Sequence, residues 1–188
     1  MPRVEPNAAT EIRRERLDER DAVGQVIRAA FGGEGERVAA LESALRSRRC
    51  GRDGLALVAE AAGVVVGQVL ITRSWLDAPR ELVEVGVLSP LSVAPTHQRR
   101  GVGTALVRAA LAAAADLALP AVFLEGDPGY YPRLGFVPAA TRGFTAPSVR
   151  IPAPAFQVVT LPAHRDWMTG ALVYADVFWE HDCVGLRG

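Results

Sequence analysis

The stretch that decides the fold reads Leu91-Ser92-Val93-Ala94-Pro95-Thr96-His97-Gln98-Arg99-Arg100-Gly101-Val102-Gly103-Thr104-Ala105-Leu106. It begins at the end of a strand expected over 82–93, which Pro95 terminates, and two glycines stand where a helix begins. The first turn of a helix leaves main-chain N–H groups without intrahelical acceptors, and the helix dipole is positive there. The stretch therefore predicts a strand, a turn and a helix start suited to a diphosphate, with Arg99 and Arg100 adding positive charge.

Other phosphate-binding glycine motifs do not fit this stretch. The dinucleotide fingerprint G-x-G-x-x-G needs a third glycine, but Leu106 stands at that position. The phosphate-loop pattern G-x-x-x-x-G-K-[ST] is absent. Glycines near a helix start are common, and a pair of arginines is usually a solvated surface feature. The glycines alone thus leave a phosphate site and an ordinary turn equally open.

The residues after the glycines predict a helix and then a strand. Over 100–119 the apolar residues recur at helical spacing, and Pro120 ends the helix. The expected buried stripe is rich in alanine, so the helix should lie close against a sheet; it consists of Val102, Leu106, Ala109, Ala110, Ala113 and Leu117. The apolar run 121–125 is typical of a strand covered on both faces. A strand, a helix and a strand in this order imply parallel neighbours.

The segments upstream and downstream predict more helices and strands. A helix over 22–31 is expected, capped by Asp18 or Asp21 and stopped by Gly32-Gly33. A second helix follows, with Val38, Leu41 and Leu45 on one side. The remaining expected elements are a weak strand over 10–15, strands over 55–60 and 64–71 around an Ala62-Gly63 turn, strands over 136–138 and 156–161, and a proline-rich loop over 146–154.

Composition narrows the class of protein. The chain has 188 residues, 21 basic and 21 acidic, which suits one domain over 1–188 and gives no sign of a nucleic-acid or membrane partner. The apolar run 61–71 is too short to cross a bilayer. Cys50 and Cys183 match no disulfide or zinc spacing, and His181 beside Cys183 does not make a metal site, so we expect no metal. A cytoplasmic location is the simplest expectation.

Two motifs resemble a known family. Gln98-Arg99-Arg100-Gly101-Val102-Gly103 matches the Q/R-x-x-G-x-G/A motif of the GNAT acetyltransferase superfamily. Tyr130-Tyr131-Pro132-Arg133-Leu134-Gly135-Phe136 resembles that family's F-Y-x-x-L-G-F signature, and the two motifs have the family's order and spacing. The run 125–131 further resembles the YhbS-like branch of predicted N-acetyltransferases.

The resemblance implies an α/β (α+β) fold of the GNAT kind. Such a fold has a central mixed, mostly antiparallel sheet with a splayed parallel strand pair, flanked by helices. The motif core would span 82–138, and an extension over 139–188 would complete the sheet and the acceptor pocket. Acetyl-CoA would be the cosubstrate, its pantetheine arm paired with Leu91, Ser92 and Val93. Its diphosphate would be held by Gln98, Arg99, Arg100, Gly101, Val102, Gly103 and Thr104.

The resemblance also implies a general acid. Tyr131 aligns with the family's proton donor, which protonates the departing thiolate; alternatively, Tyr131 is a core aromatic whose hydroxyl merely finds a partner. An incoming protonated amine must lose a proton, for which Glu84 and Glu125 are the candidate bases. Carboxylates at strand ends often make salt bridges instead, and a water chain can also carry the proton.

We therefore expect a cytoplasmic, acyl-CoA-dependent N-acyltransferase. It would transfer an acetyl group to a primary amine of a small molecule or peptide, and the resemblance also allows a homodimer. Two alternatives stay open: a non-catalytic module that binds or senses acyl-CoA, and a transferase of another acyl group such as succinyl.

Overall fold

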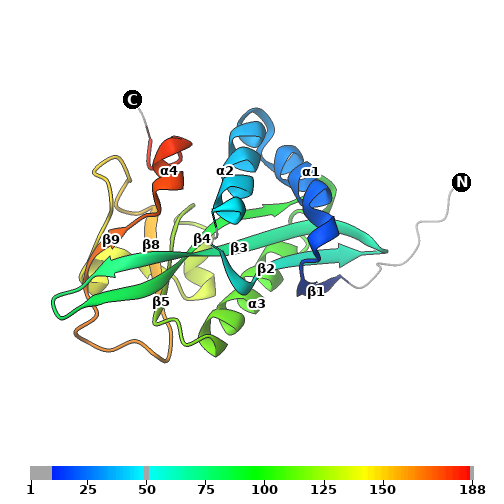
Figure 1. Cartoon of the computed structure of the whole chain (residues 1–188). Coiled ribbons are helices and arrows are strands. Elements are labelled where there is room, and N and C mark those ends of the chain that lie inside the picture. The colour runs from blue at the N-terminus through cyan, green and yellow to red at the C-terminus, as the bar shows by residue number, and fades with distance from the viewer. Residues whose placement is uncertain (1–9, 49–50, 187–188) are drawn as a thin grey trace, which may run out of the picture.

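Two long antiparallel strands, β3 (Val64–Asp77) and β4 (Leu82–Val93), form the centre of the sheet in the computed structural model (Figure 1). The model describes residues 10–48 and 51–186. The two strands pair from Gly67 opposite Val93 to Asp77 opposite Leu82. β3 also pairs with strands on its other edge, so it is hydrogen-bonded along most of its length.

Across the described residues, the sheet has nine strands. The other seven are β1 (Glu11–Arg14), β2 (Gly51–Ala61), β5 (Ala121–Glu125), β6 (Val137–Pro138), β7 (Phe144–Thr145), β8 (Phe156–Thr160) and β9 (Gly170–Val173). Their order is β1-β2-β3-β4-β5-β8-β6, while β9 pairs with both β3 and β7. The β4–β5 and β7–β9 pairs are parallel and the other pairs are antiparallel. The predicted mixed sheet with a parallel pair at 82–93 and 121–125 is therefore confirmed.

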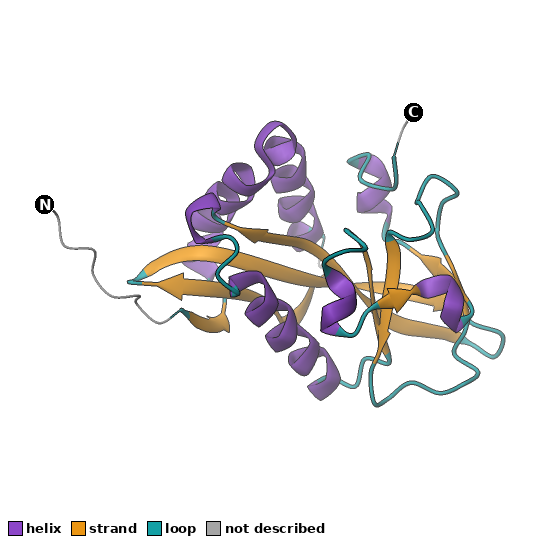
Figure 2. Cartoon of the chain, turned by 180° about the vertical axis from the view of Figure 1, so that it is seen from behind, coloured by secondary structure: helices purple, strands orange, loops and turns teal. Residues whose placement is uncertain are grey.

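Helices cover both faces of this sheet. α1 (Arg20–Phe31), α2 (Gly35–Ser47) and α4 (Asp176–Glu180) lie on one face, and α3 (Val102–Asp116) lies on the other (Figures 1 and 2). The buried side chains follow this division. Leu41 and Leu45 of α2 pack in one cluster with Val177 and Phe178 of α4, whereas Leu106 of α3 belongs to a second cluster.

The helix α3 is shorter than the predicted 100–119. Arg99 and Gly101 have φ values of +59° and +86°, and Ala118 has a φ of +57°, so residues in left-handed geometry bound the helix at both ends. Its buried stripe is also rotated from the prediction. Val102, Leu106 and Ala110 are buried as expected, but Val107 and Ala114 complete the stripe, while Ala109 and Ala113 are half-buried and Leu117 is exposed.

The predicted close packing of this helix is confirmed. At Gly67 of β3, an added Cβ would lie 3.0 Å from Cδ1 of Leu106 and 3.2 Å from Cγ1 of Val102. A glycine in the strand therefore allows the helix to approach the sheet closely.

The predicted cap of the first helix is wrong. A short 3-10 turn, Leu17–Glu19, precedes α1, and Glu19 occupies the N-cap position without a side-chain capping bond. Instead, the Glu19 carboxylate accepts hydrogen bonds from the Arg16 main-chain N–H at 2.8 Å and from Arg13 at 2.5 Å. The predicted stop is confirmed, because Gly32 ends α1 with a φ of +55°.

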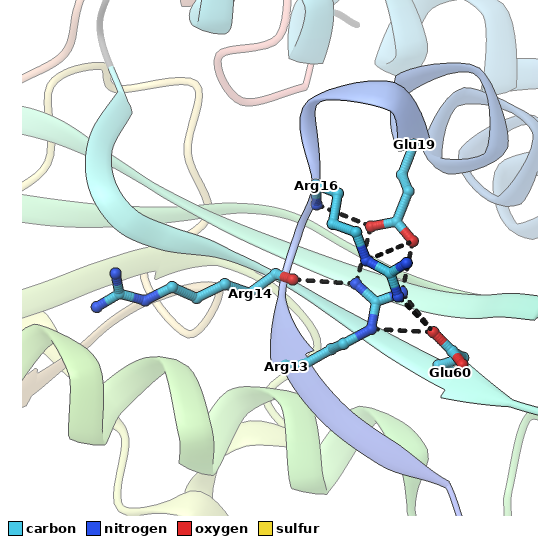
Figure 3. A network of polar contacts seen from close by, with 5 residues as sticks. All are labelled: Arg13, Arg14, Arg16, Glu19 and Glu60. Atoms are coloured by element: carbon cyan, nitrogen blue, oxygen red, sulfur yellow. Dashed lines mark hydrogen bonds and ion pairs between the residues drawn. The ribbon is translucent and has the colours of Figure 1, made fainter. Parts of the chain in front are cut away.

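The Arg13 guanidinium, on β1, links the turn before α1 to strand β2 (Figure 3). It bonds Glu19 and also Glu60 of β2, whose Oε2 accepts from Nε at 2.9 Å. Arg16 forms weaker ion pairs with the same two carboxylates. The adjacent Arg14 side chain points away from this network (Figure 3).

Several predicted elements have different lengths or were missed. The strands expected over 55–60 and 64–71 are the longer β2 and β3, joined through Ala62 and Gly63 as predicted. Residues 146–154 form a loop, as expected. β7, β9 and α4 were not predicted, since their short apolar runs carry no clear period. The expectation for Cys50 lies outside the described residues. In the part of the chain that the structure describes, no helix is long and apolar enough to cross a membrane.

We expect the Arg13→Ala variant to lose about 1–2 kcal/mol of unfolding free energy at pH 7. The part-buried carboxylates of Glu19 and Glu60 then have only Arg16 as an ion-pair partner within the described network. Arg13 lowers the pKa of Glu19 from 4.5 to about 2. This contribution is therefore complete above pH 4.5 and disappears as the pH falls towards 2. Urea unfolding at pH 7 and pH 3 should show the gap between wild type and variant narrowing at pH 3. Arg14→Ala is the control, and equal losses in the two variants would contradict the assigned network.

Candidate active site

The two parallel strands at the centre of the site separate after a short contact. β4 pairs with β5 only through Gly86 with Val122 and Val87 with Phe123. Beyond Val87, β4 continues to Val93 on the β3 side without pairing to β5. The edge of 88–93 that faces β5 is therefore open to a ligand, as the predicted splayed pair requires, although the Val93 carbonyl already accepts from Gln98.

A bulge marks this part of β4. Leu88 lies opposite Ile71 and Leu91 lies opposite Val69, so two residues, 89 and 90, oppose one residue of β3. The side chain of Gln68 spans the irregularity, with Nε2 donating to the Pro90 carbonyl at 3.3 Å and to Ser92 Oγ at 3.0 Å. The prediction that regular pairing fails at Pro90 is confirmed. Gln68 was missed as a site residue, although a polar residue inside an apolar strand was a usable signal.

The N-terminus of α3 opens towards solvent. Gly101 is its N-cap, no side chain caps the helix, and an added Cβ at Gly101 would meet nothing within 4 Å. The loop before it is held in place because Gln98 Nε2 donates to the Val93 carbonyl at 2.9 Å. Arg99 and Arg100 are exposed beside this helix start. The geometry provides uncapped N–H groups and positive charge together, which suits an anion.

The two sequence motifs meet at Gly103. An added Cβ at this position would lie 2.7 Å from the Tyr130 hydroxyl oxygen, so only glycine fits without displacing that side chain. The Tyr130 ring also carries the Arg133 guanidinium at 4.3 Å from its centroid. The contact between Gly103 and Tyr130 brings the start of α3 to the turn that follows β5.

Tyr131 lies in that same turn, which begins with Asp127 accepting a 2.7 Å bond from the Gly129 N–H. The Tyr131 ring packs edge-on against Phe136, with 5.6 Å between the ring centroids. It occupies the space that a side chain at Gly126 would fill. Burial, with smaller effects of Tyr130 and Asp127, raises the pKa of the Tyr131 phenol above its usual range. Within residues 10–48 and 51–186, the Tyr131 hydroxyl has no hydrogen-bond partner, so a structural bond does not account for it.

A cavity of about 430 Å³ occupies the gap between the separated strands. One wall comes from β4 (88–91), and another comes from the segment after β5, including Tyr130 and Tyr131. The remaining lining residues come from the helices on the face opposite α3 and from the C-terminal segment; they are Phe31, Val38, Leu41 and Cys183. The size is that of a small-molecule site.

Glu125, at the end of β5, lines this cavity, and two hydrogen bonds hold its carboxylate in place. Its Oε1 accepts from the Tyr174 hydroxyl at 2.9 Å, and its Oε2 accepts from the Gly185 main-chain N–H at 3.0 Å. Burial raises the pKa of Glu125 above its usual range, although these two donors and Arg150 act in the opposite direction. A carboxylate whose pKa is raised in this way is a stronger base than an ordinary exposed carboxylate.

The other predicted residues take different positions. Leu91 lines the cavity, whereas Ser92, Val93 and Glu84 are not part of its wall. Glu84 pairs with Trp75 in the β3–β4 ladder, before the strands separate. Over the described ranges 10–48 and 51–186, no group of three His, Cys, Asp or Glu side chains could hold a metal ion.

Several site residues were missed by sequence reasoning. Tyr174 and Gly185 lie in a segment without a recognisable motif, and only the fold brings them to Glu125. Phe31, Val38 and Leu41 look like ordinary core positions of amphipathic helices, so no sequence signal separates them from the core.

Comparisons with known proteins agree with this geometry. The family model described as acetyltransferase (GNAT) domain matches residues 11–139. A protein named uncharacterized N-acetyltransferase YjhQ, from Escherichia coli strain K12, is 35% identical over 133 residues, which cover 69% of this chain and 72% of that protein.

Two solved structures extend the likeness over nearly the whole chain. The crystal structure of the GNAT family N-acetyltransferase YhbS from Escherichia coli, in complex with CoA, has a TM-score of 0.81 and 27% identity, covering 94% of this chain and 96% of that chain. A GNAT family acetyltransferase from Brucella melitensis, in complex with acetyl-CoA, has a TM-score of 0.73 and 27% identity, covering 91% and 99%. With the family model matched over both motifs and strands β1 to β6, the chain belongs to the GNAT acetyltransferase family.

Proposed function

We propose that this chain is an N-acetyltransferase that moves an acetyl group from acetyl-CoA to a primary amine of a small molecule or peptide. Tyr131 is its general acid. The observation that carries the proposal is the position of the Tyr131 ring on the wall of a cavity between separated parallel strands, beside an uncapped helix N-terminus. The solved relatives that contain CoA and acetyl-CoA support the choice of cosubstrate.

The residues present fit the cosubstrate. The start of α3 offers the uncapped N–H groups of its first turn to a diphosphate, with the exposed Arg99 and Arg100 beside it. The unpaired edge of 88–93 offers main-chain donors and acceptors to the amide groups of a pantetheine arm. The two surfaces are adjacent, because an added Cβ at Gly103 would lie 3.7 Å from Cγ2 of Val93.

The chemistry requires one base and one acid. Glu125 takes the proton of the bound ammonium group, and the free amine nitrogen then attacks the thioester carbonyl carbon. As the carbon–sulfur bond breaks, the Tyr131 phenol donates its proton to the thiolate, and the second proton lost by the attacking nitrogen returns the Tyr131 phenolate to the phenol. The raised pKa of Tyr131 keeps the phenol protonated at neutral pH, so the donor form is always present.

Removing the Tyr131 hydroxyl tests the acid. We expect Tyr131→Phe to lower kcat by about 10²-fold or more, because the thiolate must then leave without a proton donor. The ring remains, so the Kd for acetyl-CoA, measured by calorimetry, should change little. Tyr130→Phe is the matched control and should keep most of the activity. Equal kcat values for Tyr131→Phe and wild type at every pH would remove Tyr131 from the mechanism.

Charge removal tests the diphosphate site. The double variant Arg99→Ala/Arg100→Ala is expected to raise the Kd for acetyl-CoA by roughly fivefold at low salt, since two exposed ion pairs are each worth up to about 1 kcal/mol. The loss should shrink in high salt because exposed charges are screened. Arg108→Ala, an exposed arginine further along α3, is the control and should leave the Kd unchanged. A double variant that binds like Arg108→Ala would exclude this helix start as the phosphate site.

The two candidate bases can be separated by a matched pair of variants. We expect Glu125→Gln to lower kcat/KM for the amine by about 10²-fold and Glu84→Gln to lower it less than threefold. Since burial raises the pKa of Glu125, the rate should fall on acidification at a pH above the ordinary carboxyl range, and Glu125→Gln should lack this limb. A normal acid limb in Glu125→Gln would refute Glu125 as the base.

The same assays distinguish the alternatives. Acetyl-CoA binding without transfer to any amine would indicate a non-catalytic module, and faster turnover with succinyl-CoA would indicate another acyl group. Acetylation of the protein's own lysine side chains cannot add to the measured transfer, because the sequence contains no lysine and its 21 Lys and Arg positions are all arginine.

A further inference from the structure

The cavity has a second region that the cosubstrate does not explain. Phe31, Val38 and Leu41 line it from α1 and α2, which cover the face of the sheet opposite α3. The phosphate-binding surface lies at the N-terminus of α3, on the other face. The α1–α2 region therefore provides an approach to the thioester that is separate from the path of the cosubstrate.

The side chains of this region are apolar. Leu41 is buried, Val38 is half-buried, and Phe31 at the end of α1 remains 38% exposed. Cys183 faces them from the C-terminal segment, and its Sγ donates to the His181 carbonyl at 3.3 Å. Burial raises the pKa of the Cys183 thiol, so it stays neutral. Such walls favour contact with hydrocarbon.

The charged groups of the cavity wall are negative. Glu125 and Asp127 are the ionisable carboxyl groups among its lining residues, and over residues 10–48 and 51–186 no arginine or histidine side chain lines it. The anchoring of both Glu125 oxygens by Tyr174 and Gly185 holds this carboxylate at the wall.

Two arginines near the cavity, Arg150 and Arg37, are engaged with acids of their own, and a third, Arg133, lies over the outer ring of Tyr130. Arg150, which attracts Glu125, forms an ion pair with Asp182 at 3.6 Å. Arg37, close to Cys183, is paired with Glu34. Among the described residues, the cavity wall itself carries Glu125 and Asp127, whereas Arg37, Arg133 and Arg150 stand behind it, so the charge at the wall favours a cation.

We propose that the acceptor is a primary amine on an uncharged, apolar body, with its ammonium group at Glu125 and its hydrocarbon against Phe31, Val38 and Leu41. This inference rests on the proposed N-acetyltransferase function and narrows its substrate class. An amino acid or an amino-sugar phosphate is disfavoured, because its anionic group would face the carboxylates without a cation in the wall.

Pairs of acceptors that differ by a carboxylate test whether a negative charge on the acceptor is disfavoured. With saturating acetyl-CoA and wild-type protein, thioester cleavage is followed with phenethylamine against phenylalanine and with hexylamine against 6-aminohexanoate. We expect kcat/KM at least tenfold higher for the member of each pair without a carboxylate. Val38→Arg, which adds a cation to the wall, should narrow this ratio towards one.

Chain length tests the apolar wall. Phe31→Ala should lower kcat/KM severalfold for hexylamine and leave propylamine within twofold, because only the longer chain reaches the phenyl ring. Leu117→Ala, at a side chain of similar exposure (37%) at the end of α3, should alter neither value. An equal loss for both amines in Phe31→Ala would overturn the assignment of this wall.

The outcomes separate the inference from the function on which it rests. Preference for phenylalanine or 6-aminohexanoate, or equal use of both members of each pair, would overturn the inference and leave the N-acetyltransferase function standing. Tight binding of acetyl-CoA without transfer to any of these amines or to a lysine-containing peptide would refute the proposed function itself, and the inference with it.

Discussion

The loss of pairing between β4 and β5 after Val87 is the constraint on which the rest of the site depends. A strand edge without a partner exposes main-chain donors and acceptors, and a folded protein must satisfy them by other means. Here β4 stays paired with β3 on both sides of the bulge at 89 and 90, and the Gln68 side chain supports that bulge. The sheet is thus rigid on one side of the gap and open on the other. The cavity, the tyrosine turn and the helix start are all arranged around that opening.

Close packing at glycines fixes how the parts of the site meet. Gly67 admits α3 to the sheet, Gly103 admits the Tyr130 hydroxyl to α3, and Gly126 makes room for the Tyr131 ring. The first two contacts join elements that are distant in the chain, and the third fixes the Tyr131 ring within its own turn. The proposed phosphate-binding surface and the proposed proton donor therefore belong to one packed unit, in which a shift of the helix also moves the turn.

The sequence predicted those features whose cause is local. Gly101 and Gly103 at a helix start, Pro95 at a strand end and Tyr130-Tyr131 before a turn each reflect local backbone chemistry, and the structure has the expected strand, helix and turn at these positions. The helix ends were less certain, because the left-handed Arg99 and Ala118 could not be recognised as such. Neither Asp18 nor Asp21 caps the first helix, because Glu19 occupies the N-cap position. The Glu19 side chain bonds Arg13, on a strand outside the helix, which no local pattern indicates. Tyr174 and Gly185 could not be predicted, since they approach Glu125 across 49 and 60 residues of chain.

The anchoring of Glu125 by the C-terminal segment has a consequence for how the protein is made. Both motifs and the parallel pair β4–β5 lie before residue 137, so the ribosome makes the helix start and the tyrosine turn before the C-terminal segment. The carboxylate of Glu125, however, gains its second donor only when Gly185 has been synthesised and has docked. Until Tyr174 and Gly185 have been made and have docked, the chain lacks the two donors that hold the Glu125 carboxylate in place.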